Sequence, residues 1–127
     1  MNPHLDITPE RIRPWLSPRP ADSHKGDFGA VGILGGAPGM AGAALLAARA
    51  ALWLGAGRVY AGLLDDRIAV DFAAPEIMIS GPERCLDLPE PACLVIGPGL
   101  GQGGTARQWL AAALDGMHRP RKSPPAP

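Results

Sequence analysis

Apolar residues fall along the chain in separate blocks whose lengths suit strands and helices. The first block, residues 29–36, has the length of a strand and ends in paired glycines. Residues 40–54 are rich in Ala and Leu, place Leu45, Ala48 and Leu52 on one stripe, and are followed by Gly55 and Gly57. This spacing predicts a helix that ends at those glycines.

Later blocks predict three more strands and a second helix. Residues 58–64 form a strand whose distance from the first suits a right-handed, parallel βαβ unit. Residues 77–79 indicate a short third strand. Residues 92–97 are apolar without alternation, which predicts a fourth strand covered by helices on both faces, with Cys93 buried in it. Residues 105–116 predict a helix.

The second helix and both ends of the chain carry further signals. Thr105 is a candidate N-cap, and Gly116 a candidate end of that helix. Residues 1–22 hold five prolines and predict an irregular lead-in with one helical turn near residues 10–15. Residues 117–127 are basic and proline-rich, and predict a solvated, disordered tail. The order β, α, β, β, β, α assigns residues 23–116 to the α/β class.

Composition and charge narrow the function classes. A chain of 127 residues forms one domain at most, and twelve basic residues balance twelve acidic ones. The net charge is therefore near zero, and no overall electrostatic field favours binding to nucleic acid or to a membrane surface. No signal peptide is visible and the two cysteines are too few for a secreted disulfide scaffold, so we expect a cytoplasmic protein. The sequence contains no Cys/His spacing typical of a metal site and no Ser-His-Asp arrangement.

Two glycine-rich segments follow predicted strands, at residues 35–42 (GGAPGMAG) and 97–104 (GPGLGQGG). In parallel sheets, ligands bind beyond the carboxyl ends of the strands, where glycines let the backbone approach them closely. A dinucleotide-binding fold is the obvious rival, because residues 99–104 satisfy GxGxxG. That fold also needs an acid about 20 residues further on, at the end of a second strand, and the chain is nearly over there.

The motif HKGDFG, residues 24–29, stands just before the first strand and offers an imidazole, an ammonium and a carboxylate. Lys25 is a candidate phosphate contact, and Asp27 could orient the lysine or cap a turn. A solvated polar loop explains these residues equally well.

Three separated motifs together resemble the ADP- or ATP-dependent NAD(P)H-hydrate dehydratase family. They are HKGDFGAVGILGGAPGMAGAALLAARAALWLGAGRVY from His24, PEIMI at residues 75–79, and LVIGPGLG at residues 94–101. They occur in the family's order and spacing, and the resemblance runs from about residue 8 to about residue 116. It implies a three-layer, ribokinase-like fold with a mainly parallel central sheet, cut off after about its first half.

The resemblance also implies a reaction. The family repairs hydrated NADH and NADPH by phosphorylating the added hydroxyl with ADP or ATP and Mg²⁺, after which loss of phosphate restores the nicotinamide. Ala43 and Gly99 would line the hydrated-nicotinamide pocket. The other residues expected near it are Lys25, Gly26, Gly39, Met40, Gly42 and Gly101.

The family's later motifs are absent from this sequence. They include a histidine, a nucleotide-binding stretch and a Gly-x-Gly-Asp motif with the catalytic aspartate. We therefore expect no catalytic residue in this chain, a truncated or frameshifted reading frame, and no activity from the chain alone. Two alternatives stay open: a non-catalytic nucleotide-binding or interaction module, and a fragment of a ribokinase-like small-molecule kinase. We also expect an open sheet edge, which a homo-oligomer or a partner chain could cover.

Overall fold

The computed structural model describes residues 5–118, and for Lys25, Gly26 and His118 it describes the backbone alone. The predicted tail therefore lies almost wholly outside the described residues. The helices are α1 (Pro9–Ile12), α2 (Ala41–Trp53) and α3 (Gly104–His118), with 3-10 turns η1 (Arg13–Trp15), η2 (Lys25–Phe28) and η3 (Pro82–Leu86). The strands are β1 (Ala30–Gly35), β2 (Arg58–Leu63), β3 (Met78–Ser80) and β4 (Ala92–Ile96).

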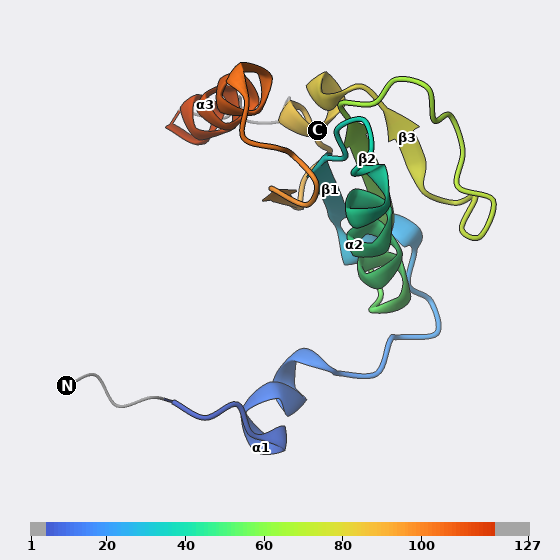
Figure 1. Cartoon of the computed structure of the whole chain (residues 1–127). Helices are drawn as coiled ribbons and strands as arrows, with labels where there is room; N and C mark the ends of the chain where they lie inside the picture. Colours follow the sequence, from blue (N-terminus) through green and yellow to red (C-terminus); the bar gives the residue numbers. More distant parts are fainter. Residues whose placement is uncertain (1–4, 119–127) are drawn as a thin grey trace, which may run out of the picture.

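A four-stranded sheet in the order β3-β2-β1-β4 forms the centre of the fold (Figure 1). Every neighbouring pair is parallel. The predicted βαβ unit of β1, α2 and β2 is confirmed, because α2 packs against both of its strands. This parallel α/β architecture places the carboxyl ends of β1, β2 and β4 at one edge of the sheet.

Different elements cover the two faces of the sheet. On one face α2 buries Ala44 and Ala48 against Ile33, Val59 and Leu63. On the other face, η3 packs on β1 and β2 and α3 packs on η3, and Tyr60 and Cys85 are buried there. Gly62 is required there, because a Cβ atom on it would lie 2.7 Å from the Cys85 sulfur. The sequence did not predict η3.

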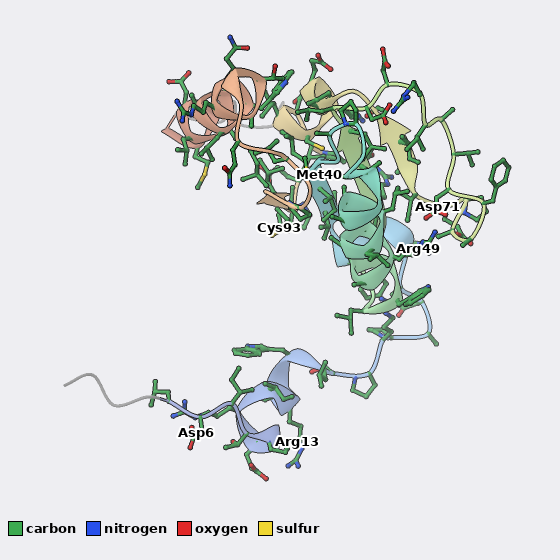
Figure 2. All side chains as sticks on the ribbon, viewed as in Figure 1. Asp6, Arg13, Met40, Arg49, Asp71 and Cys93 are labelled. Atoms are coloured by element: carbon green, nitrogen blue, oxygen red, sulfur yellow. The ribbon has the colours of Figure 1, made fainter. Side chains whose placement is uncertain are left out.

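The prediction for β4 is wrong in one respect. Its burial alternates, and both Cys93 and Val95 are exposed, although a strand covered on both faces was expected. Cys93 is in register with Val31 and Val95 with Ile33, so all four lie on the face that α2 covers. Because β4 is the edge strand and α2 packs on β1 and β2, this helix does not reach Cys93 (Figures 1 and 2).

The ends of the chain also differ in detail from the prediction. The helical turn expected near residues 10–15 is present as α1 and η1, and neither contains a buried residue. Helix α3 begins at Gly104, so Thr105 lies inside it, and it continues past Gly116. Gly116 does not end the helix because its backbone lacks the positive φ that a helix-ending glycine adopts. Within residues 5–118, no helix has the length and apolar character needed to cross a bilayer.

Candidate functional site

Two glycine-rich loops lie side by side at the carboxyl edge of the sheet. The first glycine loop, residues 35–42, joins β1 to α2, and the second, residues 97–104, joins β4 to α3. Gly36 donates its backbone N–H to the Pro98 carbonyl over 2.9 Å, and Ala37 donates to the Gly99 carbonyl over 2.7 Å. The loops meet because β1 and β4 are hydrogen-bonded neighbours.

Glycine has two distinct uses in these loops. Gly99 has φ +66°, and a Cβ atom on it would overlap the Met40 carbonyl, so the close approach of the loops requires glycine there. A Cβ atom on Gly39 or Gly42 would meet nothing within 4 Å. These two positions leave open space above the loops, which a ligand could fill.

Met40 extends from the first loop toward the second. Its methyl carbon lies 3.5 Å from where a Cβ atom on Gly101 would be, and the residue is 44% exposed. Figure 2 shows Met40 at the end of α2 that faces the segment leading into α3. Met40 therefore forms an apolar bridge between the two loops while much of its surface stays accessible.

The beginning of α2 faces the same region. Met40 occupies the N-cap position without a side-chain cap, and the first turn contains no acidic residue. Gly42 and Ala43 are exposed in this turn. The first N–H groups of a helix have no internal acceptor and carry partial positive charge, so this end favours anionic or hydrogen-bond-accepting groups.

The carboxyl end of β2 supports the first loop from its other side. The backbone N–H groups of Leu64 and Asp65 donate to the carbonyls of Gly35 and Gly36, each over 2.9 Å. The buried Asp65 carboxylate accepts two bonds from the Arg67 guanidinium, at 2.9 and 2.8 Å. Hydrogen bonds from Arg67 lower the pKa of Asp65 to about 2. This carboxylate is occupied in holding the turn after β2.

A second ion pair holds α2 itself. Arg49 donates to both carboxylate oxygens of Asp71, over 2.6 and 2.7 Å, and so ties the loop between β2 and β3 to the helix (Figure 2). Asp71 is 5% exposed, and the hydrogen bonds from Arg49 lower its pKa. Sequence reasoning missed this pair, although a lone arginine within an apolar helix is a signal that it needs a buried partner.

The HKGDFG motif lies at the opposite edge of the sheet. Residues 25–28 form η2, and the Gly29 carbonyl that follows accepts from the N–H groups of Gly57 and Arg58 at the amino end of β2. The Asp27 carboxylate accepts the His24 N–H over 2.6 Å, so it caps its own turn. The six residues of β1 separate this motif from the glycine loops.

The structure thus brings together most of the residues that the sequence singled out, but not all. Lys25 and Gly26 are a strand's length away from the others. No three His, Cys, Asp or Glu side chains of residues 5–118 are grouped so as to hold a metal ion. The residues gathered at the carboxyl edge are Gly39, Met40, Gly42, Ala43, Gly99 and Gly101.

Comparison with known proteins identifies the fold around these loops. Residues 31–119 match the family model for NAD(P)H-hydrate dehydratase. The chain belongs to the NAD(P)H-hydrate dehydratase family. An ADP-dependent (S)-NAD(P)H-hydrate dehydratase from Neisseria meningitidis is 43% identical over 98 residues, which cover 76% of this chain and 33% of the relative. A bifunctional NAD(P)H-hydrate repair enzyme from Escherichia coli is 40% identical, over 89% of this chain and 22% of its own.

Solved structures agree with this family assignment. A hypothetical protein from Streptococcus mutans matches with a TM-score of 0.75 and 30% identity, over 88% of this chain and 42% of its own. The ADP/ATP-dependent NAD(P)H-hydrate dehydratase from Bacillus subtilis, co-crystallized with ATP/Mg²⁺, matches with a TM-score of 0.63 and 31% identity, over 85% and 41%. A ribokinase-like superfamily protein from Enterococcus faecalis has a TM-score of 0.68. This chain therefore spans less than half the length of each of these relatives and solved structures.

Proposed function

We propose that this chain is the substrate-binding part of an ADP- or ATP-dependent NAD(P)H-hydrate dehydratase, a hydro-lyase that repairs hydrated NADH and NADPH. The observation that carries the proposal is the pair of hydrogen-bonded glycine loops at the carboxyl edge of the sheet. They offer close backbone approach and the positive end of a helix, which suit a dinucleotide with a pyrophosphate and a polar ring. A cytoplasmic location stays a prediction.

In this proposal, Ala43 and Gly99 line the hydrated-nicotinamide pocket. The exposed first turn of α2 presents Ala43, while Gly99 lets the second loop lie directly against Met40. Gly39, Gly42 and Gly101 complete the pocket with backbone surface. Lys25 and Gly26 are not part of it, because η2 lies at the amino edge.

The described residues do not fit the Mg²⁺ that accompanies ATP in the Bacillus subtilis structure. The two glycine loops contain no acidic side chain, and no metal-holding group exists in residues 5–118. The described residues therefore bind and orient the substrate, exclude water from one side of it and supply no proton donor or acceptor at the loops. Phosphoryl transfer depends on positioning and charge stabilisation around the phosphates, so we expect no turnover from this chain alone.

The proposal is tested by titrating the purified chain with hydrated NADH in a calorimeter, followed by an assay for nucleotide-dependent dehydration. We expect saturable binding and no turnover with ADP or ATP. Gly99→Ala, which would force the loops apart, should abolish binding. Gly116→Ala in α3 lies outside both loops, where the added Cβ atom would meet nothing within 4 Å, and should not. Wild-type protein that is folded but binds no hydrated NADH would contradict the proposed function.

A second candidate is a binding module without catalysis, which pairs the β4 edge with another chain. The exposure of Cys93 and Val95 on the apolar face of β4 favours it. Size-exclusion chromatography at several protein concentrations distinguishes the binding module from the substrate-binding part of an enzyme. A stable dimer or complex that survives dilution supports the module, while a monomer that binds hydrated NADH supports the enzyme part alone.

A further inference from the structure

Met40 is the large apolar side chain that the two glycine loops expose. Apart from Gly, Ala and Pro, the loops contain Met40, Leu100 and Gln102. Leu100 is 9% exposed and belongs to the core, whereas Met40 is 44% exposed. The Met40 methyl carbon reaches toward Gly101, so its thioether spans the two loops at the open space above Gly39 and Gly42.

The two glycine loops and the first turn of α2, which surround Met40, offer no counter-ion to a cation. Neither loop contains a charged residue, and α2 begins next to Met40 with no acid in its first turn. At the neighbouring end of β2, the buried Asp65 carboxylate is paired with Arg67, and the adjacent Asp66 is exposed to water. The positive end of α2 is therefore the charged feature directly adjacent to Met40.

We propose that Met40 sets a preference of this pocket for an uncharged nicotinamide-derived ring over the cationic ring of oxidised NAD⁺. This inference rests on the proposed function and adds the side chain that discriminates between ring states. A thioether gives a polarizable, apolar contact to an uncharged ring. The same contact removes water from a cationic ring without supplying a negative charge, which disfavours that ring. The pyrophosphate is common to both ligands, so it does not contribute to the difference.

The test compares the affinities of the full chain for hydrated NADH and for NAD⁺, by calorimetry in one buffer. We expect wild-type protein to bind hydrated NADH at least about tenfold more tightly, the size of effect that one unpaired, partly desolvated charge produces. Met40→Leu should keep this preference because it keeps the apolar surface. Met40→Glu should reduce it to less than about threefold, because a carboxylate then faces the ring.

A matched control places the same charge elsewhere on the same helix. Leu46 is 66% exposed on α2 and lies outside both loops, so Leu46→Glu should leave the preference unchanged. Met40→Gln, which is neutral and of similar length, serves if Met40→Glu does not fold by circular dichroism. Met40→Gln should weaken the binding of hydrated NADH and leave the affinity for NAD⁺ unchanged.

The outcomes separate this inference from the proposed function. Equal wild-type affinity for both ligands would overturn the inference and leave the proposed function standing. Met40 would not set the preference if both Met40→Glu and Met40→Gln kept the full preference for hydrated NADH over NAD⁺. The same would follow if Leu46→Glu lost that preference to the same extent. Folded wild-type protein that binds neither ligand would overturn both proposals.

Discussion

The backbone N–H of Ala37 donates to the carbonyl oxygen of Gly99 over 2.7 Å, and this bond joins two loops that are far apart in sequence. It forms because β1 and β4 are parallel neighbours whose chains leave the sheet at the same edge. The geometry of the candidate pocket therefore depends on the pairing of these two strands, and changes that separate the loops should affect stability and binding together.

Gly99→Ala should destabilise the fold and abolish ligand binding. The new methyl group would overlap the Met40 carbonyl, and alanine at φ +66° is strained by about 1–3 kcal/mol. Urea unfolding measures the loss of stability. The control Gly116→Ala, in α3 and outside both loops, has neither problem and should lose neither stability nor binding. An unchanged unfolding midpoint for Gly99→Ala would mean that the loops do not meet as described.

Gly42→Ala should separate stability from binding. Gly42 lies in the first turn of α2, where a Cβ atom would meet nothing within 4 Å, so alanine should stabilise the helix by ~0.5–1 kcal/mol. The same methyl group would occupy space proposed for the ligand and should weaken binding of hydrated NADH. Gly116→Ala in α3 is the matched control, which gains stability without losing affinity. Equal affinities for the two variants would argue against a pocket at Gly42.

The sequence predicted the βαβ unit and the two loops because apolar runs and glycine punctuation are local signals. It could not predict which face of β4 would be covered. Cys93 and Val95 are as apolar as their register partners Val31 and Ile33, and only the lateral position of α2 leaves the first two exposed. The same limit applies to Lys25, whose distance from the loops follows from the length of β1 and not from motif spacing.

The sequence could not predict the long-range ion pair either. Nothing in the local sequence connects Arg49 with Asp71, because the carboxylate reaches the helix only after the loop between β2 and β3 has folded back. The Asp65–Arg67 pair is local in sequence. It supports the first glycine loop because the backbone N–H of Asp65 donates to the carbonyl of Gly36, in a distant segment. Side-chain pairing of this kind requires the three-dimensional fold.

Stability should fall as the pH is lowered toward 2. The pKa of Asp65 is about 2 in the folded chain, against about 3.9 for an unfolded aspartate, and that of Asp71 is also lowered. The unfolded chain therefore takes up protons first, so the contribution of both groups is complete above about pH 4–5 and is lost as the pH falls through the folded pKa values.

Urea unfolding at a series of pH values measures this dependence. Asp65→Asn should make the free energy of unfolding less dependent on pH between about 2 and 4, because one of the two linked groups no longer titrates. Asp6→Asn, in the segment before α1, is the control and should keep the wild-type slope. Identical slopes in wild type and Asp65→Asn would contradict the described ion pair.

The two cysteines should differ strongly in reactivity. Cys93 is exposed on β4, whereas Cys85 is buried and burial raises its pKa to about 11. A thiol reagent at pH 8 should modify one cysteine quickly in the native chain and the second only after unfolding, because the thiolate is the reactive form. Cys93→Ser should remove the fast phase. Two fast thiols in the native protein would show that Cys85 of η3 is not buried against the sheet.

The most direct test of the proposed pocket is a map of backbone amide chemical shifts during titration with hydrated NADH. We predict shifts at residues 39–43 and 99–104, with little change at Gly29 and Arg58 at the amino edge of the sheet. Shifts confined to that amino edge, or no shifts in a folded chain at saturating ligand, would contradict the assignment of the substrate site to the two glycine loops.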